Sequence, residues 1–445
     1  MTAPHDDGAP ARTLSAAATR RVLLSSVIGN ALEWYDFFLY GTAAALVFGK
    51  LFFPAGTDPL VGTLGAFAGF AIGFLARPFG GLLFSHIGDR YGRKRALVST
   101  LVLMGAATFL MGLMPTYAQI GIWAPVLLVL LRILQGLAAG GEWGGAVLML
   151  TESAPKGKIG FYSSFGQAGL SLGFLLSALA FYLAQRLPAE DFMGWGWRLP
   201  FLVSIVVFAV GVYIRSRVPE TRAFVEAQAT GQTVAKVPAL EVLKRHPREV
   251  LIAMGLRVAE NGSSYIFVAF SLGFGKFVGA PDDMILLAMI VSFVIQMPVL
   301  IAFGALADRI GTKPIYMFGS ITLMLMAFPF FSLIGTKDPT YIFLAFMLAN
   351  TVSYSAMCAT QPMLFSSFFG TSIRYSGLAL GHEIAAVFSG GLSPFIATAL
   401  LGAYHSSAPV SLYLIFLGAV TTLTCLAIKR PAMAQETAGA ATAAG

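Results

Sequence analysis

Long apolar runs follow one another along almost the whole chain and are separated by short polar segments. A helix needs about 20 apolar residues to cross the hydrocarbon core of a bilayer, and twelve of the runs are long enough. We predict transmembrane spans at residues 22–48, 60–84, 96–114, 122–150, 160–185, 198–216, 249–275, 284–306, 315–334, 340–368, 375–403 and 408–428. An even number of spans places both ends of the chain on the same side of the membrane.

The composition agrees with a chain that lies almost entirely in the membrane. Of the 445 residues, 57% are hydrophobic and 11% are charged, whereas soluble domains have about 25% charged residues. A water-soluble fold is therefore excluded, and the spans leave no room for a catalytic domain. Only five histidines are present, four of them in tails or loops, and no metal-ligand cluster or nucleophile–histidine arrangement is visible. We expect no enzyme, no cofactor and no metal.

The basic residues predict the orientation. Of the 29 lysines and arginines, 21 lie on the side that carries the termini, five lie on the other side and three lie inside spans. Because cytoplasmic loops carry an excess of Lys and Arg, both termini are predicted to be cytoplasmic. The net charge of +8 then reflects topology, and the basic run 93–95 is a cytoplasmic loop and not a nucleic-acid site.

The longest polar segment divides the spans into two groups of six. It covers residues 217–248 and contains three prolines, so we predict a cytoplasmic linker between a six-helix bundle at 22–216 and a second at 249–429. Residues 1–21 lack the apolar region and cleavage site of a signal peptide. We expect them to form a disordered cytosolic tail, with a second short tail at 430–445.

A short turn motif is repeated six spans apart. Asp89-Arg90 and Gly92 follow the second span, and Asp308-Arg309 and Gly311 follow the eighth. Parallel halves of this kind are typical of major facilitator transporters. The predicted fold class is an all-α membrane protein with twelve transmembrane helices in two pseudo-symmetric bundles.

On these residues the chain resembles the major facilitator superfamily, although Ser85 stands where the family motif usually begins with glycine. It further resembles the metabolite:proton symporters in the segments Gly29–Phe37, Arg132–Gly136, Gly140–Gly145 and Trp197–Phe201. The segments that look most like the shikimate-permease branch are Glu152–Lys156, Phe161–Ser164, Gln361–Met363 and Arg374–Gly377. The resemblance implies a carrier of the bacterial inner membrane that works by alternating access. The family also transports dicarboxylates, citrate, aromatic acids, betaine and proline.

Charged residues inside spans are costly and therefore mark candidate functional sites. Asp36 and Arg132 are predicted to lie at one depth in spans one and four, with Glu33 one helical turn from Asp36. Many proton-coupled relatives place an acid against an arginine there, so we predict that Asp36 and Glu33 bind the proton and that Arg132 holds the ionised form. A permanent ion pair that locks the first bundle is the alternative.

Two polar stripes are candidates for substrate binding. On span seven, helical spacing aligns Arg257, Glu260, Asn261, Ser264 and Tyr265. Here the arginine either grips a substrate carboxylate or only pairs with its neighbouring acid. On span ten the stripe is Asn350, Tyr354 and Gln361, which suits either substrate hydroxyls or helix–helix hydrogen bonds.

The other candidates are single residues or pairs. His382-Glu383 on span eleven is expected to influence substrate or proton behaviour, or to form a buried tertiary contact. Arg77 is expected either in a salt-bridge network or against the ligand. The further substrate-binding candidates on spans one and four are Asn30, Tyr40 and Gln135.

Gating is predicted from the repeated turn. Asp89 is expected at the positive N-terminus of span eleven near Arg374, with Arg90 and Arg93 bracing nearby acids. By symmetry, Asp308 is expected to act on span five.

We therefore predict a monomeric carrier in the lipid bilayer that imports a small organic acid, shikimate-like or another carboxylate, with protons. The alternative is an exchanger or exporter of a carboxylate or a zwitterionic metabolite. A transport-derived sensor would need an added signalling domain, and none is visible in the sequence.

Overall fold

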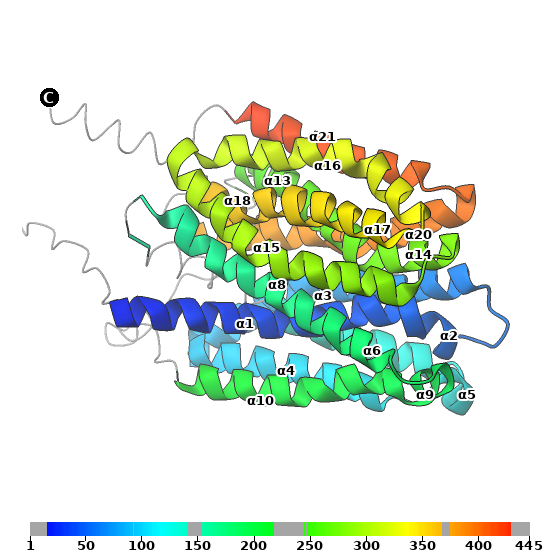
Figure 1. The fold of residues 1–445 in the computed structure, drawn as a ribbon. Coiled ribbons are helices and arrows are strands. Elements are labelled where there is room, and N and C mark those ends of the chain that lie inside the picture. Colours follow the sequence, from blue (N-terminus) through cyan, green and yellow to red (C-terminus); the bar gives the residue numbers. More distant parts are fainter. Residues whose placement is uncertain are drawn as a thin grey trace, which may run out of the picture.

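The computed structural model describes residues 16–91, 93–140, 154–155, 157–217, 244, 247–366 and 374–428. Within these residues every regular element is a helix. The helices run roughly parallel to one another, with those of the first half of the chain in the lower part of Figure 1 and those of the second half in the upper part. The all-α fold class is confirmed.

In the first half, span one is built from several helical elements and span four is only partly described. Span one is α1 (Ala16–Ala43) followed by a π-helical turn, η1 (Ala44–Phe48), and the short α2 (Gly49–Leu51). The other elements are α3 (Pro59–Tyr91), α4 (Arg93–Leu113), α5 (Tyr117–Ile120), α6 (Trp123–Ala139), α8 (Ile159–Ala184), α9 (Ala189–Gly194), η2 (Gly196–Arg198) and α10 (Leu199–Arg217).

In the second half, π-helical turns interrupt three of the long helices. The elements are α13 (Pro247–Tyr265), η3 (Ile266–Phe270), α14 (Ser271–Val278), α15 (Asp282–Ile310), α16 (Thr312–Gly335), α17 (Pro339–Phe346), η4 (Met347–Tyr354), α18 (Ser355–Ser366), α19 (Arg374–Ala385), η5 (Ala386–Gly391), α20 (Leu392–Tyr404) and α21 (Ala408–Ala427). Turns of this type are frequent at functional sites.

Most predicted spans coincide with helices to within a few residues, and three differ. α3 continues to Tyr91, seven residues past the end of the second predicted span. α1 begins at Ala16, so the last residues of the predicted tail are helical, because an Ala-rich segment has high helix propensity. α6 ends at Ala139, and the rest of the fourth predicted span lies outside the described residues. Eight of the described helices are long and apolar enough to cross a membrane, and 98–113 and 123–139 are shorter apolar helices. The number of twelve spans remains a prediction.

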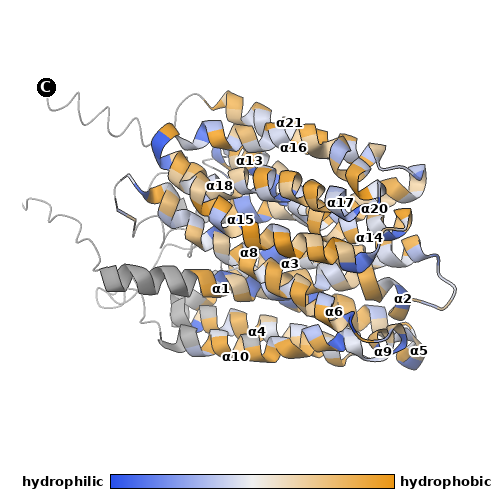
Figure 2. Ribbon diagram, in the orientation of Figure 1, coloured by the Kyte–Doolittle hydropathy of each residue, from blue (hydrophilic) through white to orange (hydrophobic). Residues whose placement is uncertain are grey.

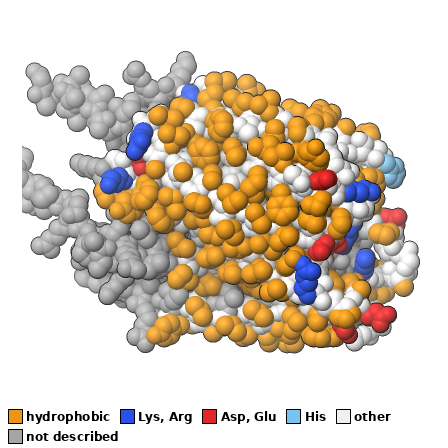
Figure 3. All heavy atoms as spheres, in the orientation of Figure 1, with side chains coloured by type: hydrophobic (Ala, Val, Ile, Leu, Met, Phe, Trp, Pro, Cys, Tyr) orange, Lys and Arg blue, Asp and Glu red, His pale blue; other side chains and the backbone are white. Residues whose placement is uncertain are grey.

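The outer surface of the molecule is apolar. Hydrophobic residues dominate the middle of the helices in Figure 2, and in Figure 3 hydrophobic side chains cover a broad band while charged side chains gather toward the ends. Many large apolar side chains are exposed, among them Leu75, Phe79, Val206, Leu325 and Leu423. An exposed apolar surface of this extent marks contact with the lipid bilayer.

The two halves meet along helices that are distant in the sequence. α8 of the first half packs against α15 of the second, and α3 packs against α19, η5 and α20. Within the first half, α3 and α6 touch backbone to backbone, because a Cβ atom at Gly80, Gly136 or Gly140 would collide with a carbonyl oxygen of the other helix. This close packing holds the two helices that carry Arg77 and Arg132.

Candidate functional site: a polar cavity between the halves

A small cavity lies between the two halves. The first half contributes Trp34 from α1 and Gln167, Leu170 and Phe174 from α8. The second half lines it with Arg257, Glu260, Asn261, Ser264, Tyr354 and Gln361. A site at the interface of two structural repeats is the usual location for the substrate of a transporter. Four of the five residues of the stripe predicted on span seven and two of the three predicted on span ten are therefore brought together.

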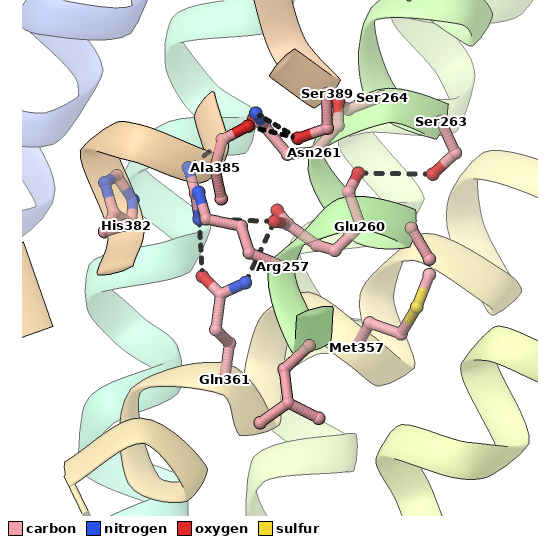
Figure 4. Close-up of polar contacts among 12 residues, drawn as sticks. Arg257, Glu260, Asn261, Ser263, Ser264, Met357, Gln361, His382, Ala385 and Ser389 are labelled. Atoms are coloured by element: carbon pink, nitrogen blue, oxygen red, sulfur yellow. Dashed lines mark hydrogen bonds and ion pairs between the residues drawn. The ribbon is translucent and has the colours of Figure 1, made fainter. Parts of the chain in front are cut away.

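Arg257 is the centre of a hydrogen-bonded network on the second-half side of the cavity (Figure 4). Its guanidinium lies 3.3 Å from Glu260 Oε2 and donates to Gln361 Oε1 at 2.8 Å. Gln361 Nε2 donates in turn to Glu260 Oε2 at 2.9 Å. Arg257 also lies 3.5 Å from Asn261 Oδ1, and Asn261 donates to Ser389 at 3.2 Å. The pairing of Arg257 with Glu260 is thus present, and the pair lines the cavity.

The first-half side of the cavity is mainly aromatic. The Trp34 and Phe174 rings meet edge to face, with centroids 6.1 Å apart. The indole N–H of Trp34 is buried and makes no hydrogen bond to any described residue. Buried N–H groups normally have a partner, so this donor is a candidate for a hydrogen bond to a molecule in the cavity that Trp34 lines.

The predicted ion pair between Asp36 and Arg132 is wrong. Among the described residues no ion pair joins them; the Arg132 guanidinium lies over the rings of Tyr40 at 4.1 Å and Phe37 at 4.6 Å, and it donates to Gln135. Asp36 is one residue before Phe37 and is therefore rotated by about 100° from that face of the helix. Its carboxyl lies close to Thr108 of α4 instead. The two residues lie at a similar depth, because Gln135, one turn from Arg132, donates to the backbone carbonyl of Asp36, but the Asp36 side chain lies on another face of its helix.

Arg77 forms an ion pair with Glu383 across the two halves. Arg77 Nε lies 2.7 Å from Glu383 Oε2, and Arg77 Nη2 lies 3.2 Å from Oε1. His382 Nδ1 lies 2.8 Å from the same Oε1 atom. Glu33, which was predicted to assist Asp36, interacts electrostatically with Arg77. The expectation of a salt-bridge network at Arg77 therefore agrees with the structure, and none of these four residues lines the cavity.

Several predicted substrate-binding residues hold helices together instead. Asn30 donates to the carbonyl of Gly166 at 2.8 Å, and Tyr40 donates to the carbonyl of Ala66 at 3.1 Å. Gln135 donates to Thr108 at 2.8 Å. Polar side chains commonly form such helix–helix hydrogen bonds in membranes.

Asn350 and Tyr265 are also placed outside the cavity. Asn350 donates to Ser292 of α15 at 2.9 Å, which is the helix–helix alternative for this residue. The Tyr265 ring stacks on Phe38 of the first half, with centroids 5.1 Å apart. Both are buried, because their positions on the helix face a neighbouring helix and not the cavity.

Contacts between the halves also lie at both ends of the helices. Near the end where α8 begins, Asp308 Oδ1 and Oδ2 accept from the backbone N–H groups of Gly160 and Phe161 at 2.7 and 2.9 Å. We call this the inner contact. It agrees with the prediction, made by symmetry with Asp89, that Asp308 acts on span five. At the opposite end, Lys276 donates to the carbonyls of Ala45 and Leu46 at 2.9 and 3.2 Å, which we call the outer contact.

The other gating predictions cannot be compared with the structure. The side chains of Asp89, Arg90, Arg93 and Arg374 lie outside the described residues. Their predicted contacts remain predictions.

Sequence reasoning missed Gln167 and the aromatic side of the cavity. Gln167 is the one amide side chain in a span whose other polar residues are serines and tyrosines, and that difference was a usable signal. Leu170 and Phe174 had none, because apolar residues that line a cavity and those that face lipid look the same in a membrane sequence.

The family model for the major facilitator superfamily matches residues 26–394. The chain belongs to this superfamily, and it is a transporter of the inner membrane and not an enzyme. The shikimate transporter of Escherichia coli strain K12 is 43% identical over 94% of this chain and 96% of its own length. The proline/betaine transporter of Salmonella typhimurium strain LT2 is 35% identical over 93% of this chain and 84% of its own length.

A solved structure gives independent support for the fold. The xylose transporter XylE from Escherichia coli, in a partially occluded inward-open conformation, superposes with a TM-score of 0.69 over 92% of this chain and 97% of that chain. The two sequences are 19% identical. At this identity the likeness supports the fold alone.

Proposed function

We propose that this protein imports a small hydroxylated organic acid, with shikimate as the model substrate, together with protons. One observation carries the proposal: Arg257, a buried cation, lines a cavity between the halves whose other polar residues are mostly neutral. A guanidinium binds a carboxylate bidentately, and amide and hydroxyl groups suit the hydroxyls of a polyol acid. The shikimate transporter relative agrees with this substrate class.

The two sides of the cavity suit the two faces of a small ring. Asn261, Ser264 and Gln361 offer hydrogen-bonding groups on the second-half side. Trp34 offers an apolar ring and an N–H donor on the other side. Binding sites for small molecules combine apolar surface with a few placed polar groups in this way.

The inner and outer contacts support alternating access. In our proposal the inner contact at Asp308 is broken when the cavity opens to the cytoplasm, and the outer contact at Lys276 is broken when it opens outward. A substrate that contacts residues of both halves stabilises the state in which all of these contacts form. The same scheme assigns residues 22–216 and 249–429 to the two moving bundles of a monomer.

A second candidate function follows from Glu260. A carboxylate beside Arg257 gives the cavity both signs of charge, which suits a zwitterion, and the proline/betaine transporter relative agrees with that. In this case the protein exchanges or exports a zwitterionic metabolite. The first candidate is preferred because the shikimate transporter relative is 43% identical to this chain, compared with 35% for the proline/betaine transporter.

Ligand-dependent stability separates the two candidates. A ligand that binds only the folded state raises the melting temperature by mass action, so shikimate and quinate are expected to stabilise the purified protein, while betaine and proline leave it unchanged. Trp34→Phe keeps the ring but removes the N–H, and it is expected to weaken shikimate binding about 2- to 13-fold, the equivalent of about 0.5–1.5 kcal/mol for one hydrogen bond. Stabilisation by betaine and not by the acids would reverse the preference.

A further inference from the structure

The ion pair between Arg77 and Glu383 joins residues that are 306 positions apart. Arg77 lies on α3 in the first half, Glu383 lies on α19 in the second, and their side chains are 1% and 7% exposed. We call it the inter-half pair. His382 holds the same carboxylate from the adjacent position.

Among the ion pairs between described residues, the inter-half pair is the one that connects the halves. The pair of Arg257 with Glu260 and the pair of Lys276 with Asp282 both lie within the second half. Moving α3 away from α19 would leave two buried charges without their partner, which is strongly unfavourable. The halves therefore cannot separate on this side while both members of the pair are charged.

Arg77 has an acid available in each half. Glu33 on α1 of its own half interacts with it electrostatically, as does Tyr265 on α13. The guanidinium also lies over the rings of Phe37 and Phe74, at 5.3 and 5.4 Å. Among the residues that the structure describes, the other charged and titratable groups that act on the inter-half pair and on His382 are Glu33, Arg132, Arg257 and Tyr265. If Glu383 loses its charge, Glu33 still balances Arg77 inside the first half.

The inter-half pair lies toward the end of the helices where the inner contact is found. Glu383 is nine residues after the start of α19 at Arg374, about 14 Å along the helix axis. Tyr404, at the other end of the same span, is more than twice as far away in sequence. Along this span the pair therefore lies nearer to the end with the inner contact than to the opposite end, and it joins α19 to α3 there.

We propose that Glu383 carries the transported proton and that its charge controls whether the inner side is closed. This inference rests on the proposed function. An ionised Glu383 binds Arg77 and holds α19 against α3. A proton that arrives from the outer side adds to a Glu383 oxygen, the ion pair is lost, and the inner side opens. Release of that proton to the cytoplasm restores the carboxylate, which binds Arg77 again and closes the inner side.

A distance measurement tests this without any substrate. Lys158 in the first half and Arg309 in the second are exposed and flank the inner contact, and the two native cysteines are buried. Spin labels on Lys158→Cys and Arg309→Cys report opening of the inner side in the full-length protein. With native Glu383, lowering the pH from mildly alkaline to mildly acidic is expected to lengthen the distance. With Glu383→Gln the long distance is expected at both pH values; a pH-dependent shift like that of native Glu383 would overturn the inference.

Two matched variants complete the test. Glu190→Gln removes an exposed acid on α9, and Asp36→Asn removes a buried acid that forms no ion pair with any described residue. Both are expected to keep the pH-dependent shift, and its loss in Asp36→Asn would move the proton to span one and overturn the inference. If Glu383→Gln does not fold, the double variant Arg77→Gln/Glu383→Gln leaves neither member of the pair charged. It is expected to show no pH-dependent shift.

Transport then separates this inference from the proposed function. Proteoliposomes with Glu383→Gln are expected to equilibrate labelled shikimate but not to accumulate it under an inward proton gradient. Accumulation equal to the wild type would overturn the role of Glu383. If the wild type moves no organic acid but its inner side still opens with pH through Glu383, the proposed substrate is wrong and the proton switch stands.

Discussion

Replacing Arg257 by lysine is expected to weaken binding of shikimate by about 30-fold or more, because a loss of 2 kcal/mol or more is typical when a buried charged hydrogen-bond partner is removed. Lysine keeps the positive charge but lacks the planar fork that binds a carboxylate bidentately. Its ammonium can still satisfy Glu260, which lies 3.3 Å from the native guanidinium. The measurement is shikimate binding to the purified variant by calorimetry, with its melting temperature as a check on folding.

A double variant distinguishes substrate binding from a structural ion pair. Arg257→Gln together with Glu260→Gln removes both charges and leaves hydrogen-bonding groups that Gln361 can still meet. It is expected to fold and to lose shikimate binding. If this double variant binds shikimate as tightly as the wild type, Arg257 serves only to neutralise Glu260.

Replacing Gly136 by alanine is expected to destabilise the protein strongly, at or above the upper end of the roughly 1–3 kcal/mol that overpacking costs in a core. The added Cβ would collide with the carbonyl oxygen of Gly73 on α3, and backbone cannot move away as a flexible side chain can. Forcing α3 and α6 apart would also disturb Arg132, whose guanidinium lies 3.1 Å from the position of a Cβ at Gly73. The expected result is a large fall in melting temperature or a loss of folded protein in detergent.

Gly273→Ala is the matched control for this prediction. Gly273 lies in α14, and a Cβ there would meet no atom within 4 Å. Alanine has a higher helix propensity than glycine by roughly 0.5–1 kcal/mol, so this variant is expected to be as stable as the wild type or more stable. Equal stability of the two alanine variants would contradict the close packing of α3 and α6.

The spans and the local pairs could be predicted from sequence because their signals are local. Long apolar runs predicted α8 and α15 to within a few residues. The spacing of three residues between Arg257 and Glu260 predicted their contact, because residues three apart lie on the same face of a helix. In both cases the chain segment itself carries the information.

The tertiary pairs could not be predicted in the same way. Nothing in the neighbourhood of Arg77 indicates that its partner is Glu383, because the contact depends on how two halves dock. For Asp36 and Arg132, an ion pair was predicted that the structure does not contain. Their depths agree, but a helix turns by about 100° per residue and places Asp36 on another face. Depth in the membrane can be counted along a sequence, whereas the direction of a side chain depends on how the helices pack.

In the proposed mechanism, an inward proton gradient drives uptake of a hydroxylated organic acid. Purified protein in proteoliposomes, given labelled shikimate outside and a pH-sensitive dye inside, tests it most directly. We predict that an acidic exterior drives shikimate to a higher concentration inside than outside, that the interior acidifies as shikimate enters, and that a protonophore abolishes both effects. Shikimate that only equilibrates across the membrane, or that accumulates without acidification of the interior, would contradict the claim.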